Sequence, residues 1–251
     1  MRPEEDAYGQ AMLDHFRGKE AWEIVERDDG FFMIGAGPEL YFAPIENWRE
    51  AERKVMKYVR GRVLDIGCGA GRVALQLQGL GHEVVGIDLS PAAIETCRLR
   101  GVADARVMSI DDVDSSLGTF DTIVMLGGNL GLLGNRERGR GILTKLADTT
   151  SDEALILGAS RDRTESTDPD IVDYFSKNLM QGRLSGQGRI RIRYRKYVTP
   201  WFDFLRMTVE ELRGLLTGTG WRLRETIPSD DSLYVASDRK GSVIDTCPLY
   251  T

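Results

Sequence analysis

The sequence predicts an α/β fold, a Rossmann-like sheet of seven mostly parallel strands with helices on both faces. Two observations carry this prediction. From Val63 onward, short apolar segments alternate with amphipathic segments of helical length, the pattern of parallel strands joined by right-handed helical crossovers. The first apolar segment also runs directly into a glycine turn, Ile66-Gly-Cys-Gly-Ala-Gly-Arg72, which opens a helix. Such a turn lets backbone N–H groups approach a ligand closely.

The core elements follow in chain order from periodicity and turn residues. Strands are expected at 63–66, 83–87, 105–109, 120–126 and 154–158. Helices are expected between them at 71–79, 91–99 and 135–148. A helix at 208–217 and a closing pair of strands at 221–227 and 232–237 complete the core, which we place within residues 61–240.

The regions outside this core are expected to cover it. Residues 1–60 predict an N-terminal helical cover, with helices at Glu4–Phe16 and Ile45–Val59 and a turn-rich stretch at Asp28–Pro38 that could lie over a pocket. Residues 241–251 read as a loosely ordered tail.

A late β-strand insertion is expected at about 160–205, outside the core sheet. It contains a helix at 171–179, a turn at Gly186-Gln-Gly188 and a strand at Arg189–Tyr197. Period two puts the arginines of this strand on one face and its apolar residues on the other. The arginines are Arg189, Arg191, Arg193 and Arg195, and the opposite face carries Ile190, Ile192 and Tyr194.

Composition limits the function classes. With 251 residues, 41% hydrophobic and 29% charged, the chain suits one large globular domain, and its net charge of −6 gives no overall attraction to nucleic acid. Cys68, Cys97 and Cys247 form no metal-like pair, so we expect no metal site and a reducing compartment. No apolar run reaches the length of a membrane span and the first residues are acidic, which predicts a cytoplasmic protein.

The glycine turn predicts the kind of ligand. Gly67, Gly69 and Gly71 form a G-x-G-x-G pattern, one residue tighter than the G-x-G-x-x-G of dinucleotide enzymes, and residues 67–72 contain no P-loop lysine. The second strand ends at Asp88, about twenty residues downstream, where a Rossmann-type fold binds a ribose. The expected ligand therefore carries a ribose and no pyrophosphate.

These residues resemble the class I S-adenosylmethionine-dependent methyltransferases, over a block from Val63 to Gly134 and more loosely to Asp238. The resemblance implies that Asp65 and the glycine turn hold the methionine part of S-adenosylmethionine and that Asp88 takes the ribose hydroxyls. The cofactor contacts that it implies are Asp65, Gly67, Cys68, Gly69, Asp88, Leu89, Ile110, Asp111 and Leu126.

The sequence indicates the residue that contacts adenine less clearly than it indicates the glycine turn and Asp88. The family commonly places a carboxylate after the third strand, and Asp111 is our candidate, with the backbone of Ile110 beside it. The commonest family spacing points instead near Ser109, and a plain solvent-facing acidic turn at 111–112 is the alternative.

The resemblance also implies that the segment after the fourth strand, Met125–Gly131, faces the transferred methyl group. Its adjacent glycines Gly127 and Gly128 leave room there, and Asn129 could present an amide to the acceptor. The Asn/Asp-Pro-Pro-aromatic motif of nucleic-acid amino methyltransferases is absent from this place, which favours a small-molecule acceptor.

No catalytic residue is assigned from the sequence. The candidates for a general base are His15 and His82, of which His15 is preferred, although a lone histidine is more often structural. Four aromatic residues either line an acceptor pocket or pack in the interior. They are Tyr8, Tyr41, Tyr197 and Trp201.

The predicted function is methyl transfer from S-adenosylmethionine to a small-molecule acceptor. One alternative is an RNA or protein methyltransferase that uses the Arg189–Arg195 face, and another is a non-catalytic cofactor-binding or assembly protein. A nicotinamide dehydrogenase is a distant third. Because the chain is acidic, we interpret the arginine face as a solvated or self-associating surface in preference to a polyanion site.

Overall fold

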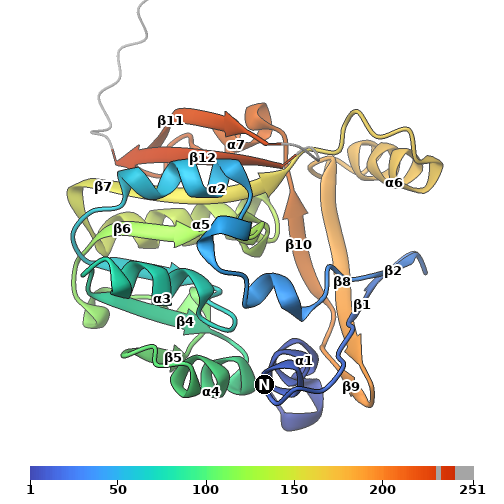
Figure 1. Ribbon diagram of the computed structural model, residues 1–251. Helices are drawn as coiled ribbons and strands as arrows, with labels where there is room; N and C mark the ends of the chain where they lie inside the picture. Colours follow the sequence, from blue (N-terminus) through green and yellow to red (C-terminus); the bar gives the residue numbers. More distant parts are fainter. Residues whose placement is uncertain (230–232, 241–251) are drawn as a thin grey trace, which may run out of the picture.

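The structure is a computed structural model that describes residues 1–229 and the backbone of residues 233–240. Its large sheet has the strand order β11-β12-β7-β6-β3-β4-β5 (Figure 1). Strands β3 to β7 run parallel to one another, while β12 is antiparallel to both β7 and β11. The strands are β3 (Val63–Ile66), β4 (Val84–Asp88), β5 (Ala105–Val107), β6 (Phe120–Met125), β7 (Thr150–Arg161), β11 (Trp221–Pro228) and β12 (Leu233–Lys240).

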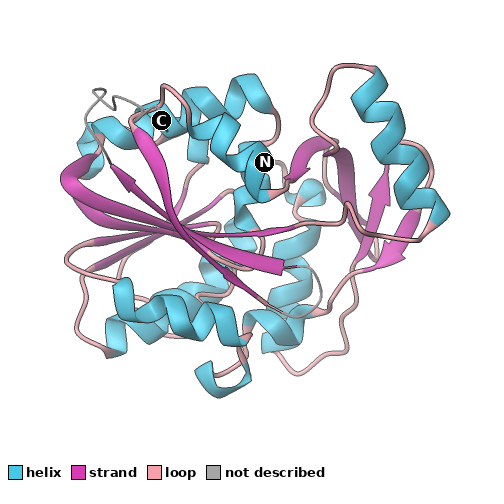
Figure 2. Cartoon of the chain, turned by 90° about the horizontal axis from the view of Figure 1, so that it is seen from above, coloured by secondary structure: helices cyan, strands magenta, loops and turns pink. Residues whose placement is uncertain are grey.

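Helices lie on both faces of this sheet (Figure 2), so the predicted Rossmann-like architecture is confirmed. Polar residues fix where the helices begin: Ser90 caps α4 and Asn135 caps α5, each by accepting a backbone N–H. The helices are α2 (Glu50–Val55), α3 (Arg72–Gly79), α4 (Pro91–Leu99), α5 (Arg136–Asp148) and α7 (Val209–Leu216).

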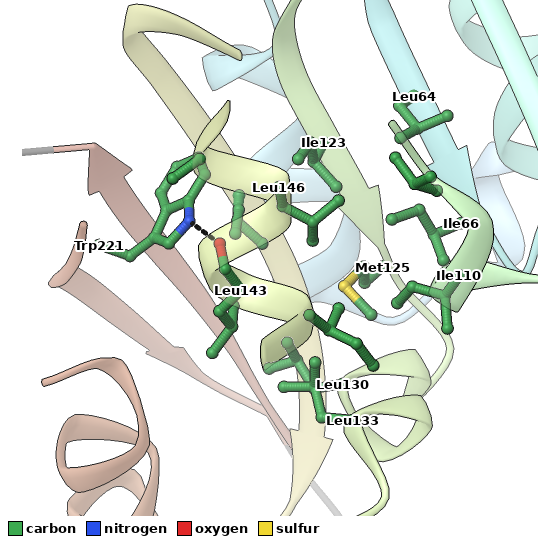
Figure 3. Close-up of a cluster of buried hydrophobic side chains, with 14 of the residues drawn as sticks. Leu64, Ile66, Ile110, Ile123, Met125, Leu130, Leu133, Leu143, Leu146 and Trp221 are labelled. Atoms are coloured by element: carbon green, nitrogen blue, oxygen red, sulfur yellow. Dashed lines mark hydrogen bonds between the residues drawn. The ribbon is translucent and has the colours of Figure 1, made fainter. Parts of the chain in front are cut away.

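The core consists of a cluster of buried side chains on each face of the sheet. Figure 3 shows one of them, in which Ile123 and Met125 of β6 face Leu143 and Leu146 of α5. The indole N–H of Trp221 donates to the carbonyl of Leu143 at 2.9 Å, which satisfies the one polar group that this ring buries. Near-complete burial of strand side chains on both faces explains why the sequence reads there as continuous apolar runs.

A second, antiparallel sheet stands beyond the carboxyl ends of the parallel strands (Figure 1). It joins the two ends of the chain, because β1 of the N-terminal region pairs with β8 of the late region. Its order is β10-β8-β1-β2, with β9 paired to β8. The elements are β1 (Ile24–Arg27), β2 (Phe32–Ile34), β8 (Gly186–Tyr194), β9 (Tyr197–Val198) and β10 (Phe202–Arg206), accompanied by α1 (Ala7–Phe16) and α6 (Pro169–Met180).

The N-terminal region is less helical than predicted. The single helix expected at Glu4–Phe16 is interrupted at Asp6, whose carboxylate accepts from Gly9 N and so starts α1 at Ala7. The helix expected at Ile45–Val59 is broken by extended backbone at Trp48 and Arg49. Short 3-10 turns occupy the rest of the region, at Pro3–Glu5, Pro38–Tyr41, Ile45–Asn47 and Met56–Tyr58.

The late region also differs from the prediction. The expected turn at 186–188 is already part of β8, and the strand ends at Tyr194 because Arg195 adopts a positive φ of 51° in the turn to β9. Strand β10 was not predicted, and β7 extends well beyond 154–158. The expected tail at 241–251 lies outside the described residues. Within the described part of the chain, no helix combines the length and apolarity needed to cross a membrane.

Candidate functional site

The glycine turn lies where β3 ends and α3 begins, and its backbone requires glycine. Gly67, Gly69 and Gly71 have φ values of 70°, 54° and 80°, which other residues rarely adopt. A Cβ on Gly67 would also lie 2.6 Å from Nδ2 of Asn129. The N–H groups of Gly67 and Cys68 donate to the carbonyl of Ile87 at 2.9 and 3.0 Å, which holds the turn against the end of β4.

Asp88 ends β4 beside this turn. Its carboxylate accepts from Gly69 N at 3.0 Å and from Ser90 N at 2.9 Å, so it fixes the turn and the start of α4 at once. Burial raises the pKa of Asp88, and the charge of Asp6 adds to the increase. Each carboxylate oxygen has a further lone pair, so Asp88 can still accept hydroxyl groups of a ligand.

Asp65, at the end of β3, is buried with 2% of its surface exposed, and its Oδ2 atom has no hydrogen-bond partner. Burial raises its pKa to about 7, and the nearby Arg72 only partly opposes this shift. An unsatisfied buried carboxylate is costly unless a ligand completes it. Asp65 and Asp88 therefore give this site an unmatched negative potential that favours a cationic ligand.

The N-terminal region covers the turn. A Cβ on Gly69 would lie 3.4 Å from Cε of Met12 and 3.7 Å from Cδ1 of Tyr41. The rings of Tyr8 and Tyr41 meet edge to face with centroids 6.1 Å apart. Arg100 links the N-terminal region to the glycine turn, because its guanidinium donates to the carbonyl of Ala70 at 2.5 Å and to that of Tyr41 at 3.2 Å.

Asp6 anchors this cover to the core. Its carboxylate accepts from the hydroxyl of Ser90 and, at 2.9 Å, from the backbone N–H of Ala92 at the start of α4. The α1 helix is thereby held next to Asp88, and Tyr41, which follows the stretch 28–38 that the sequence suggested as a cover, lies at the glycine turn.

Glu23 adds a second buried carboxylate to the covered space. It is 1% exposed; Oε1 accepts from Gly37 N at 3.3 Å, and Oε2 has no partner. Its charge contributes to raising the pKa of Tyr8 and of Tyr41, after burial in both cases. Glu23 therefore lies close to the tyrosine pair, on the side of the site that the N-terminal strand provides.

Family and structure comparisons agree with this geometry. A family model described as a methyltransferase domain matches residues 63–150. A crystal structure of an S-adenosylmethionine-dependent methyltransferase from Bacteroides fragilis, in complex with S-adenosylhomocysteine, is 27% identical and superposes with a TM-score of 0.80, covering 95% of this chain and 96% of that one. Residues 63–150 of this chain are therefore a methyltransferase domain.

Two further proteins define how far the similarity extends. A ubiquinone biosynthesis O-methyltransferase from Xanthomonas oryzae pv. oryzae is 37% identical to this chain over 71 residues, which is 26% of this chain and 30% of that protein. The match thus spans about a third of that relative. The CcbJ methyltransferase from Streptomyces caelestis is 15% identical, with a TM-score of 0.64 over 96% of this chain and 100% of that one, and shares the fold.

The remaining predicted contacts of the methyltransferase domain are placed as follows. Leu89 is 49% exposed beside Asp88, whereas Ile110 and Leu126 are buried in the two core clusters. Cys68 is buried with its sulfur 3.8 Å from that of Cys97, and burial together with Cys97 raises its pKa well above the usual value, so it fills space as a thiol. Asp111 is half-exposed and accepts two hydrogen bonds from Arg138, at 3.0 and 2.7 Å.

Asn129 plays a different part from the one predicted. Its amide N–H group donates to the carbonyls of Ile66 and Gly67 at 3.0 and 2.9 Å. It therefore holds the end of β3 in place, and this nitrogen is not available to an acceptor. The adjacent glycines do adopt positive φ, 72° at Gly127 and 90° at Gly128, as a side-chain-free segment at this point allows.

The contacts described for the two histidines and for two of the four aromatic residues are with groups other than Asp65 and Asp88. His82 contacts the carbonyl of Gly61 at 3.1 Å, and His15 packs its ring 4.8 Å from that of Phe42. The ring of Trp201 contacts the guanidinium of Arg191 on the small sheet. Tyr197 belongs to β9, which pairs with β8. Only Tyr8 and Tyr41 are brought to the site, where they form part of its cover.

The predicted arginine face is largely occupied by intramolecular contacts. Arg191 and Arg193 both bind the carboxylate of Glu26. All three side chains remain partly exposed. Arg195, in the turn, contacts the hydroxyl of Tyr194 at 2.9 Å. These contacts are those expected of a solvated strand face.

Sequence reasoning missed Glu23, Asp6 and Glu52. Glu52 is fully buried in α2, where it binds Arg72 at 3.1 and 3.2 Å and accepts from Gly127 N at 2.8 Å, thus joining the glycine-turn helix to the loop after β6. Glutamates in an amphipathic helix or before a short strand resemble surface residues. Only their three-dimensional partners mark them as functional.

Asp65 predicts a pH dependence of stability. Its folded pKa of about 7 exceeds the ordinary value of 3.8, so the neutral form favours folding; this stabilisation is complete below about pH 4 and is lost as pH rises to about 7. Replacing Asp65 by asparagine should remove a loss of about 3 kcal/mol between about pH 5 and about pH 8. Urea unfolding of both proteins at the two pH values measures it. Equal pH responses would contradict the assignment.

Proposed function

We propose that the chain transfers the methyl group of S-adenosylmethionine to a small-molecule acceptor. The observation that carries the proposal is the buried, unpartnered Oδ2 of Asp65, next to Asp88 at a turn whose backbone only glycine tolerates. A cationic sulfonium compound with a ribose fits this arrangement, since negative charge is unmatched there. The neighbour from Bacteroides fragilis, whose structure contains S-adenosylhomocysteine, supports the same assignment.

The residues of the chain have distinct parts in this proposal. Asp65 attracts the cationic methionine part, Asp88 accepts the ribose hydroxyls, and the glycine turn allows close approach of the backbone. S-adenosylmethionine supplies an electrophilic methyl group for in-line displacement. The cover formed by Met12, Tyr8 and Tyr41 excludes water from that space. Glu23 is our candidate for holding a proton of the acceptor, because one of its oxygens is free.

The contacts of the arginine face favour a small acceptor over a polyanion, since Arg191 and Arg193 already share Glu26. We also infer a reducing compartment, the cytoplasm, because Cys68 and Cys97 are buried thiols whose sulfurs lie close together without a bond. The adenine contact at Asp111 remains part of the proposal; binding there has to compete with Arg138.

The experiment combines calorimetry with a transfer assay. Gly69→Val should lower the affinity for S-adenosylmethionine at least tenfold, because the side chain is strained at positive φ and is directed toward Met12 and Tyr41. Gly81→Val is the matched control: φ there is also positive, 90°, and no atom lies within 4 Å of its Cβ position. Equal affinities for the two variants would contradict the cofactor site.

Transfer itself is followed with methyl-labelled cofactor and a cell extract divided into small metabolites and macromolecules. Label is expected in the metabolite fraction. Label confined to RNA or protein would overturn the small-molecule assignment, and tight binding without any transfer would favour the non-catalytic alternative.

A further inference from the structure

A pocket opens between α6 and the face of the small sheet that looks toward the large sheet. Arg27 and Ile190 are register partners on this face, and Arg206 follows on β10. The pocket has a cavity volume of about 30 Å³, within about 390 Å³ of atom-free space that includes open solvent. Its walls combine apolar and aromatic side chains with three arginines, Arg27, Arg163 and Arg206.

The three arginines differ in how they are satisfied. Arg27 is bound by both carboxylate oxygens of Asp29, at 2.8 and 2.7 Å, and by the carbonyl of Asp170 at 3.0 Å. For Arg163 and Arg206, no carboxylate within the described residues lies at ion-pair distance. Among the described residues, these two cations of the pocket have no anion at ion-pair distance.

The surroundings of Arg206 make the lack of a nearby anion unfavourable for the stability of the protein. Burial lowers the pKa of Arg206 to about 10, and the neighbouring positive charges of Arg163, Arg161 and Arg27 act in the same direction. A partly buried guanidinium among like charges destabilises the empty protein. Natural proteins keep such groups where a ligand completes them.

The pocket adjoins the proposed methyl-transfer space. Ile190 lines it and also packs in one cluster with Tyr8 and Phe204. Phe204 rests on Gly131 in the turn after β6, where a Cβ would lie 2.3 Å from its ring. The pKa of Tyr8 responds to the charges of both Arg206 and Asp88, so Tyr8 lies within electrostatic reach of the pocket and of the cofactor carboxylate.

We propose that this pocket is the acceptor subsite and that Arg206, assisted by Arg163, binds an anionic group, a carboxylate or a phosphate ester, on an apolar or aromatic methyl acceptor. This inference rests on the proposed function and gives its acceptor a chemical class. Guanidinium groups bind such anions through paired N–H donors, and Phe31, Phe175 and Ile171 offer an apolar wall for the body of the molecule.

The test measures binding of three probes, benzoate, phenyl phosphate and neutral benzamide, to the full chain saturated with S-adenosylhomocysteine. Benzoate or phenyl phosphate should bind at least tenfold tighter than benzamide, and the tighter of the two identifies the anionic group. Arg206→Met should lower the ratio of anion affinity to benzamide affinity at least tenfold. Arg189→Met is the matched control, since Arg189 is exposed on the opposite face of β8.

Thermal unfolding separates a binding role from a structural one. Because Arg206→Met removes a charge that has no anion among the described residues and keeps an unbranched apolar stem, the empty variant should melt about 2–4 °C higher than the wild type. The proposal is overturned if the anions bind no better than benzamide, if the Arg206 and Arg189 variants bind them equally, or if Arg206→Met lowers the melting temperature. S-adenosylhomocysteine binding should be unchanged in both variants; its absence in the wild type would instead overturn the proposed function.

Discussion

Asp88→Ala should lower the affinity for S-adenosylmethionine by about 10- to 100-fold, the largest effect expected on binding from a single site residue. Two effects add together. The variant loses the acceptor proposed for the ribose hydroxyls, and it releases the N–H groups of Gly69 and Ser90 that Asp88 now holds at 3.0 and 2.9 Å. Isothermal titration calorimetry with S-adenosylmethionine measures the change.

Two companion variants make this result specific. Asp88→Asn keeps one acceptor oxygen and should lose less affinity than the alanine variant. Asp173→Asn removes an exposed carboxylate of α6 that pairs only with Lys177 among the described residues, and it should bind as the wild type does. A wild-type affinity in Asp88→Ala would mean that the ribose is bound elsewhere.

Glu52→Leu should lower the free energy of unfolding by about 3–5 kcal/mol, the largest stability effect expected. The substitution leaves the Arg72 guanidinium and the N–H of Gly127 without their carboxylate partner inside the protein, although Arg72 still stacks 4.5 Å from the Trp48 ring. Urea denaturation monitored by tryptophan fluorescence gives the value.

The matched control is Glu50→Ala, two residues earlier in α2, where the ion pair with Lys54 is exposed and should change stability by less than about 1 kcal/mol. The double variant Glu52→Leu/Arg72→Leu should recover part of the loss, because it removes both charges together. If the double variant is as unstable as the sum of the single changes, the two residues do not act as a pair.

The parallel core could be predicted because its signals are local. Each strand is an apolar run that ends in a turn residue, and the carboxylates Asp65 and Asp88 follow directly from their places at strand ends. The small sheet could not be predicted in the same way. Strands β1 and β2 have four and three residues, and β1 is fixed mainly by pairing with β8, more than 160 residues away.

The same reason limits prediction of the site. Glu23 and Arg206 come from opposite ends of the chain, and neither has a sequence motif. Their meaning depends on what faces them: among the described residues, an oxygen of Glu23 beside the tyrosine pair lacks a hydrogen-bond partner and the guanidinium of Arg206 lacks an anion at ion-pair distance. Asn129, by contrast, was predicted to present its amide to an acceptor, but the amide N–H group binds the carbonyls of Ile66 in β3 and Gly67 in the glycine turn.

The pairing of β1 with β8 has a consequence for biosynthesis. Residues 24–27 emerge from the ribosome long before residues 190–193, their register partners, have been made. The small sheet therefore cannot be completed until residues 190–193 have been made, and we expect the parallel strands β3 to β7, which end at Arg161, to acquire their native form first. Closing so long a loop is slow relative to local folding, so catalytic competence should lag behind core formation during refolding.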